Sequence, residues 1–316
     1  MLASDFPARL LAGLIYAIAW CIGRIPLRLL RALGSAAGRL AHATNIREAK
    51  VARRNLEIIA PELSATEREA QVGAILRATG RNALETLRIW TSSRPANLRL
   101  IRDQVGVQHF DAALASGRGL IVAAPHYGNW ELLNQWLAMK TALAILYAPP
   151  DSPVAEAFLN IVRADSGSAD RVTQVRAEGP AGVRALLKLL KDGGVVGILP
   201  DQQPKLGDGE FAPFFGKPAL TMSLLTRLAA RTGATVLFCY CESIRAEGGA
   251  PGFALHVEPT PAAIADPDPQ VSVATLNGGV ERIARRDPAQ YQWTYKRYSR
   301  RPKDSGESNP YHPDCY

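Results

Sequence analysis

A histidine and a glutamate separated by four residues, His126 and Glu131, have the residue types of a general base and its supporting acid. The apolar run 120–123 before them predicts a buried strand, and the apolar spacing over 132–137 predicts a helix. His126 is therefore expected in an exposed turn, with Asn129 as the helix N-cap and Glu131 in the first helical turn. Such a turn would bring the carboxylate against the imidazole. The alternative is a surface histidine beside a helix cap, but the strand-to-helix position favours the chemical interpretation.

The segment 124–131, Ala-Pro-His-Tyr-Gly-Asn-Trp-Glu, resembles the signature of the bacterial lipid A late acyltransferases. These are lauroyl and myristoyl transferases, distantly akin to the glycerol-phosphate acyltransferases. Further matching segments follow one another in the expected order, at 55–56, 61–64, 199–202, 211–219 and 288–302. The likeness covers nearly the whole chain, except for roughly the last fifteen residues. It implies an O-acyltransferase that moves a fatty acyl chain from an acyl carrier protein thioester, or as second choice from acyl-CoA, to a hydroxyl of a lipid A precursor.

Acyl transfer to a hydroxyl needs a base, a stabiliser for the oxyanion and a grip on the acceptor. We expect His126 to take the acceptor's proton and Glu131 to fix the imidazole tautomer and favour the imidazolium. No serine or cysteine adjoins the histidine, so direct attack on the thioester is expected rather than a covalent acyl-enzyme. Asn129, or the backbone N–H groups of the turn, is the candidate that would meet the oxyanion.

Three further residues are candidates for substrate binding. Arg163 matches, in position, an arginine of the family that is thought to bind substrate, although a cation at a helix C-terminus would also stabilise the helix dipole. Asp201 follows the predicted strand 195–199 and could orient the acceptor or support His126, with a plain turn carboxylate as the alternative. Lys217 is a candidate phosphate contact, against the simpler interpretation of a solvated surface lysine. The aromatic residues of this region could line an acyl groove, although such clusters more often belong to the core: Phe211, Phe214 and Phe215.

One segment departs from the family pattern. After the second predicted strand the family usually has an arginine and a polar residue where this chain has Ala148 and Pro150. If that arginine grips an anionic substrate, its loss puts the acceptor in question. Another lipid acceptor (a lysophospholipid, an aminolipid or a glycolipid) therefore stays open, as does a non-catalytic lipid- or carrier-binding protein.

The composition indicates a globular protein with a basic surface. The chain has 316 residues, 47% of them hydrophobic, and a net charge of +8. Its first 60 residues contain nine cations and three anions. Such a segment suits an anionic membrane surface, an acidic carrier protein or nucleic acid, but no nucleic-acid motif accompanies it. The four cysteines show no metal-binding spacing, so we expect neither a metal nor a cofactor, and a reducing setting.

The N-terminus is predicted to associate with a membrane. Residues 10–22 carry no charge but number only 13, whereas a span takes about 20 apolar residues. Arg24, Arg28 and Arg31 recur at helical spacing, which favours an interfacial anchor whose arginines meet lipid phosphates. A tilted span stays open. If the segment spans, the excess positive charge after it places the rest of the chain in the cytoplasm. Together with the resemblance, this implies the cytoplasmic face of the bacterial inner membrane.

The elements predict an α/β fold with a largely parallel sheet flanked by helices, like that of the glycerol-phosphate acyltransferases. We expect an anchoring segment 1–45, an acyltransferase domain 46–302 and a disordered tail 303–316. Helices are expected at 47–60, from a capping box at 64–67 to 90, and at 153–164, 180–191, 219–231 and 271–285. Strands are expected at 120–123, 142–147, 171–175, 195–199 and 235–240, with an edge strand at 253–257.

Overall fold

The computed structural model describes residues 6–147, 150, 152–165, 171–176, 179–245 and 249–316. Its centre is a seven-stranded sheet in the order β1-β9-β8-β2-β5-β3-β4, in which only the pair β8–β9 is antiparallel. The strands are β1 (Ile101–Val105), β2 (Leu120–Ala123), β3 (Leu143–Tyr147), β4 (Val172–Arg176), β5 (Val195–Ile198), β8 (Thr235–Arg245) and β9 (Pro251–Pro259). The predicted largely parallel α/β sheet is confirmed.

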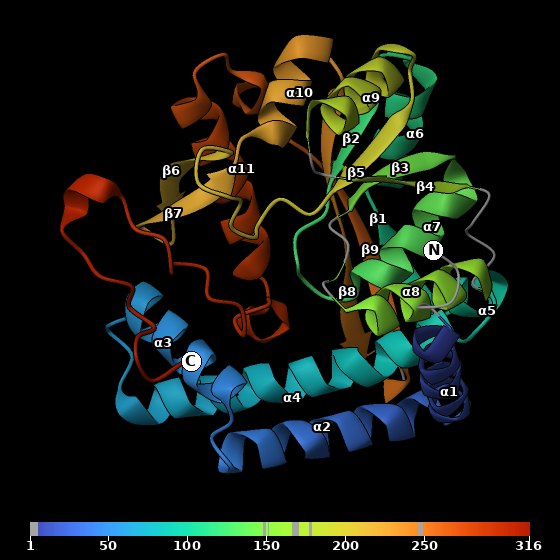
Figure 1. The fold of residues 1–316 in the computed structure, drawn as a ribbon, viewed down its shortest axis with the longest axis vertical. Coiled ribbons are helices and arrows are strands. Elements are labelled where there is room, and N and C mark those ends of the chain that lie inside the picture. The colour runs from blue at the N-terminus through green and yellow to red at the C-terminus, as the bar shows by residue number, and fades with distance from the viewer. Residues whose placement is uncertain (1–5, 148–149, 151, 166–170, 177–178, 246–248) are drawn as a thin grey trace.

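Helices cover both faces of this sheet (Figure 1). Helices α6 (Val107–Ala115) and α7 (Trp130–Lys140) share a buried apolar cluster with one face. The other face packs against α9 (Gly179–Lys191), α10 (Leu224–Thr232) and α11 (Pro269–Ala284). Strand β2 alternates between the two clusters, so both of its faces are buried, as its continuous apolar run requires. The segment that contains His126 therefore begins on a fixed strand.

Two strand predictions were wrong. Strand β9 lies between β1 and β8 and not at the edge, which β1 occupies. Residues 219–222, predicted as the start of a helix, belong to β7 (Lys217–Met222), which forms an antiparallel hairpin with β6 (Gly209–Phe214). Phe215 and Gly216 make its turn with φ values of 50° and 70°. A phenylalanine rarely adopts a positive φ, so residue type gave no signal for this turn.

The N-terminal segment contains two helices, α1 (Phe6–Gly23) and α2 (Leu27–Ala43), which are bent by 115°. Helix α2 runs along α4 (Ala65–Trp90), as Figure 1 shows. Gly34 and Gly38 of α2 lie directly on the backbone of α4. The segment 1–45 is therefore not a separate extension, because α2 forms part of the folded body. Among the described residues no single helix is long and apolar enough to cross a bilayer; the bent pair together has the length and composition.

The predicted basic face of this segment is also different in the structure. Arg24 lies in the break between the helices and donates to the Thr91 carbonyl. Arg31 points into the protein, where it pairs with the buried Glu85 and donates to two backbone carbonyls. Arg24 and Arg28 are exposed, whereas Arg31 is turned away from the surface of α2. A single row of lipid-facing arginines was therefore a wrong prediction.

The helical hairpin around 60 and the C-terminus pack together. Helix α3 (Arg47–Ile59) and the capping box formed by Ser64 and Glu67 confirm their predictions. The tail, however, is packed and not disordered: Tyr311 is fully buried and donates to Asn55 on α3. Asn55 in turn donates to the carbonyls of Trp293 and Tyr295. These bonds tie the tail to the segment that borders the functional site. Two short helices complete the described elements outside the sheet: α5 (Arg94–Leu98) and α8 (Pro153–Asp165).

Candidate active site at the end of strand β2

In the turn after β2, every backbone N–H group from His126 to Asn129 donates a hydrogen bond. Tyr127 donates to Pro125, Gly128 to Gln290 and Asn129 to Cys241, each at 2.7–3.1 Å. Gly128 has φ 64°, and a Cβ there would collide with the Cys241 carbonyl, so glycine is required. The fourth N–H group, that of His126, donates to a side chain described next. The imidazole is therefore placed by a rigid turn.

His126 is held by Asp201. Ala123 of β2 pairs with Ile198 of β5, and each functional residue follows its strand three positions later. Asp201 accepts from the His126 backbone N–H at 2.8 Å and lies 2.7 Å from imidazole Nδ1. The predicted support of His126 by Asp201 is therefore what the geometry shows. His126 and Asp201 are 75 residues apart in the chain, and the neighbouring parallel strands β2 and β5 bring them together.

Asp201 is almost fully buried, with 3% of its surface exposed. Burial by itself raises the pKa of its carboxyl, but the charge and hydrogen bonds of His126 and the nearby Arg297 outweigh burial and lower it. The carboxylate is thus ionised and accepts a hydrogen bond from the Nδ1–H group of the imidazole. This fixes the neutral imidazole with its hydrogen on Nδ1 and its lone pair on Nε2, the arrangement that a general base needs.

Arg297 is a buried cation that the sequence analysis did not single out. Its guanidinium donates to the Leu220 carbonyl and to Thr221 Oγ1, both at 2.6 Å, and lies over the Phe214 ring. Only 2% of the residue is exposed. The positive charge behind Asp201 helps keep that carboxylate ionised. The only sequence signal was its place in the conspicuous aromatic segment 288–302.

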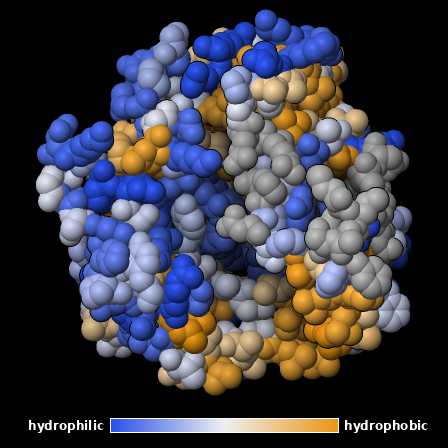
Figure 2. Space-filling model, viewed as in Figure 1, coloured by the Kyte–Doolittle hydropathy of each residue, from blue (hydrophilic) through white to orange (hydrophobic). Residues whose placement is uncertain are grey.

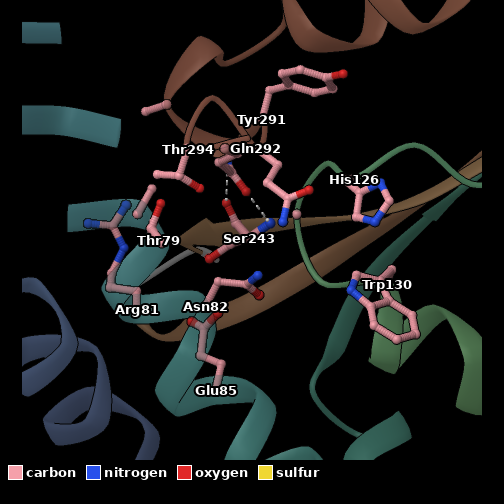
Figure 3. A pocket seen from close by; sticks show the side chains of 14 residues that line it. Thr79, Arg81, Asn82, Glu85, His126, Trp130, Ser243, Tyr291, Gln292 and Thr294 are labelled. Carbon is pink, nitrogen blue, oxygen red and sulfur yellow. Dashed lines mark hydrogen bonds between the residues drawn. The ribbon is translucent and has the colours of Figure 1, made fainter. Parts of the chain in front are cut away.

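The imidazole opens on a pocket of about 100 Å³ (Figure 3). Its wall comes from α4, the turn after β2 and the segment 289–294. Imidazole Nε2 lies 3.3 Å from the Gln202 side-chain amide, the one described bond on that nitrogen. On α4, Asn82 accepts from Asn129 through Oδ1. Asn82 itself lines the pocket, and its Nδ2 has no hydrogen bond to a described residue, which makes it a candidate donor to a bound carbonyl oxygen.

Asn129 is the predicted N-cap, since its Oδ1 accepts from the Leu132 N–H at 3.0 Å. Its Nδ2 donates to Asn82 and Thr86 on α4. The side chain and the turn N–H groups are thus used within the protein, so their expected contact with an oxyanion is not supported. Glu131 lies half-buried in the first turn of α7, as predicted. The bond to Nδ1 comes from Asp201, and a contact between Glu131 and His126 stays a prediction.

The remaining candidates are not gathered at this pocket by the described contacts. Arg163 belongs to α8, and its side chain lies outside the described residues, as does Ala148. Lys217 is exposed at the start of β7 and does not line the pocket. Phe214 is fully buried among Tyr291, Trp293 and Tyr298 and therefore belongs to the core.

A histidine held by a buried acid at the carboxyl edge of an α/β sheet is an arrangement that suits general-base catalysis. Comparison with known proteins makes this specific. The chain belongs to the family of bacterial lipid A biosynthesis acyltransferases, whose family model matches residues 3–300. It is an acyltransferase that acts on lipids.

Individual relatives fit this assignment. Over 290 residues and 90% of both chains, the protein is 25% identical to the lipid A biosynthesis lauroyltransferase of Escherichia coli (strain K12). It is 26% identical to the palmitoleoyltransferase of the same strain, over 93% of this chain and 92% of the relative. It is also 29% identical to a phosphatidylinositol mannoside acyltransferase of Mycobacterium tuberculosis, over 53% of each chain.

Proposed function

We propose that this protein transfers a fatty acyl chain from an acyl thioester to a hydroxyl of a lipid A precursor at the membrane surface. The observation that carries the proposal is the His126–Asp201 pair opening on the pocket. A general base needs an imidazole lone pair that faces a pocket, whereas a non-catalytic lipid- or carrier-binding protein does not need one.

The reaction proceeds by direct transfer. The acceptor hydroxyl displaces Gln202 from imidazole Nε2 and gives its proton to that nitrogen while its oxygen attacks the thioester carbonyl. Asp201 stabilises the imidazolium that forms. When the C–S bond breaks, the imidazolium returns the proton to the leaving sulfur. The products are an ester and a free thiol, and the histidine is regenerated.

A lipid A precursor is the acceptor that the family name supports best. The mycobacterial relative carries the name of a glycolipid acyltransferase, which favours a different glycolipid as the alternative. The departure from the family pattern at Ala148 and Pro150 keeps that alternative in view.

An acyl carrier protein is our preferred donor over coenzyme A. Carrier proteins are acidic, and the net charge of +8 would steer such a partner toward this protein. The preference is tested by comparing the turnover of one acyl chain on the two carriers at several salt concentrations. A strong preference for the coenzyme A thioester would reverse it.

Membrane association is supported by α1. Its large apolar residues are exposed to an extent unusual for a folded surface, and they gather on one part of the molecule (Figure 2): Leu10, Leu14, Ile18 and Trp20, each at 44–61% exposure. Exchange of Leu10, Leu14 and Ile18 for serine should therefore weaken sedimentation with anionic vesicles while leaving activity toward a detergent-solubilised acceptor. Unchanged sedimentation would contradict attachment through α1. The location that we propose for the enzyme is the cytoplasmic face of the bacterial inner membrane.

Mass spectrometry of total lipids tests the acceptor. Cells that lack the protein, cells that regain it and cells that regain His126→Ala should differ by one acyl chain on one lipid. That difference names both the chain and the acceptor. The proposal fails if the lipid profile is the same in all three, or if the acylated species is not a lipid A precursor.

A further inference from the structure

A second cavity, of about 500 Å³, adjoins the catalytic pocket. The two are joined through shared wall residues, since Arg81, Ser243 and Gln290 line both. Helix α2 contributes one face, at residues 28, 31, 32 and 35, and Arg81 comes from α4. A molecule seated at His126 can therefore extend into this second cavity.

The arginines of this second cavity differ in what they already bind. Arg31 is fully engaged with Glu85 and with the carbonyls of Ile244 and Gly252. Arg81 makes one long hydrogen bond, to Ser35 Oγ at 3.4 Å, and no other to a described residue. Arg28 is exposed and has no ion pair or hydrogen bond within the described part of the chain. Two cations at this cavity thus keep most of their donors for a ligand.

Arg81 is in an unfavourable place for an unpaired cation. It is half-buried, and burial lowers the pKa of its guanidinium, although the charge of Glu85 works in the opposite direction. A carboxylate, Asp287, also lines the cavity. Its two oxygens accept from the Ala289 N–H and from the Gln290 side chain, so it caps a short helix and does not pair directly with Arg81. The remaining N–H donors of Arg81 are therefore suited to bind an anion.

We propose that Arg81 and Arg28, with Ser35, bind a phosphate monoester on the headgroup of the acceptor whose hydroxyl lies at His126. The planar fork of guanidinium donors suits phosphate, and the serine hydroxyl adds a further donor. In Figure 3, Arg81 and His126 lie on opposite sides of the catalytic pocket, so the phosphate and the reacting hydroxyl are held apart. This inference rests on the proposed function, because it takes the acceptor to be a phosphorylated glycolipid.

The test uses the full-length protein in detergent and two probes, an acylated glucosamine disaccharide bisphosphate and the same lipid after phosphatase treatment. Binding and transfer are measured separately for the wild type and for Arg81→Gln, Arg28→Gln and Arg81→Lys. Arg118→Gln is the matched control, because Arg118 is an exposed arginine before the amino end of β2. Thermal melting confirms that each variant is folded.

The wild type should bind the phosphorylated lipid at least about tenfold more tightly than the dephosphorylated one, since a charge-assisted contact of this kind is worth about one factor of ten. Arg81→Gln should abolish that preference, Arg28→Gln should reduce it and Arg81→Lys should keep part of it. Arg118→Gln should behave as the wild type.

Equal binding of the two lipids by the wild type would overturn the proposal. It is overturned too if the arginine variants lose only their affinity for phosphatidylglycerol vesicles, because the anion would then belong to the membrane. If the phosphate preference depends on Arg81 but no acyl chain is transferred, the phosphate site stands and the proposed function fails.

Discussion

Two of the histidine–carboxylate pairs in the described part of the chain, His126 with Asp201 and His256 with Glu242, have partly buried imidazoles and yet differ in their surroundings. His126 gives Nδ1 to Asp201 and presents Nε2 to a pocket. His256 lies in β9 with Nε2 3.2 Å from Glu242, and its ring is stacked on Tyr240 at 4.8 Å. The two acids also differ, because Glu242 accepts from Tyr127 and Arg286 as well. What sets His126 apart from His256 is therefore a second ring nitrogen that faces a pocket, and not the presence of an acid.

The largest expected effect separates the two histidines. His126→Ala should lower the rate of acyl transfer about 10²–10⁴-fold with little change in melting temperature, because it removes a base and no core contact. His256→Ala should lower the melting temperature and keep most of the turnover per folded molecule. The two are compared by thiol release and thermal melting. Equal losses of turnover would remove the distinction between the pairs.

The next effect concerns which acid orients the base. Asp201→Asn replaces the acceptor that fixes the tautomer of His126 and should slow transfer about 10²-fold, less than loss of the base itself. Glu131→Gln is the matched variant, since it makes the same chemical change at the other candidate acid. A larger loss of kcat in Glu131→Gln than in Asp201→Asn would return the orienting role to Glu131.

The smallest effect on turnover, and the clearest on acid stability, is expected at Glu242. Burial raises the pKa of its carboxyl, but hydrogen bonds from His256, Tyr127 and Arg286 lower it from 4.5 to about 2. Because the pKa is lower in the folded state, this stabilisation is fully present above pH 4.5 and is lost as the pH falls toward 2. Glu242→Gln should therefore reduce the free energy of unfolding at pH 7 by about 1–3 kcal/mol.

Denaturant unfolding at a series of pH values measures this. The gap between the wild type and Glu242→Gln should close between pH 4.5 and 2, while thiol release per folded molecule at pH 7 stays near that of the wild type. A gap that does not change with pH would mean that the ionised carboxylate is not what stabilises the cluster.

Local patterns in the sequence predicted the parts of the site that depend on neighbouring residues. The strand before His126, the cap at Asn129 and the place of Glu131 in the first helical turn all follow from spacing within a few residues. The bond from Asp201 does not, since it joins residues 75 apart in the chain. It depends on β2 and β5 being neighbours, which periodicity cannot reveal.

The wrong predictions share that physical reason. Helical spacing predicted a lipid-facing Arg31, but Glu85, 54 residues away, draws its side chain into the protein. Polar composition predicted a disordered tail, but one buried tyrosine, Tyr311, anchors it to Asn55. In both cases a single long-range partner outweighs the local tendency, and a partner of that kind leaves no periodic trace in the sequence.

The close glycine contact between α2 and α4 has a mechanical consequence. Gly34 and Gly38 contact the α4 backbone directly, and Gly80 of α4 contacts Gly34. Because no side chains separate the two helices at these points, one helix cannot easily slide along the other. Helix α4 carries Asn82 and Arg81, so we expect α2 and this wall of the pocket to move together as one rigid unit. If α1 attaches to the bilayer as proposed, the position of this unit relative to the bilayer surface would set how far a lipid headgroup must leave the bilayer to reach the His126 imidazole.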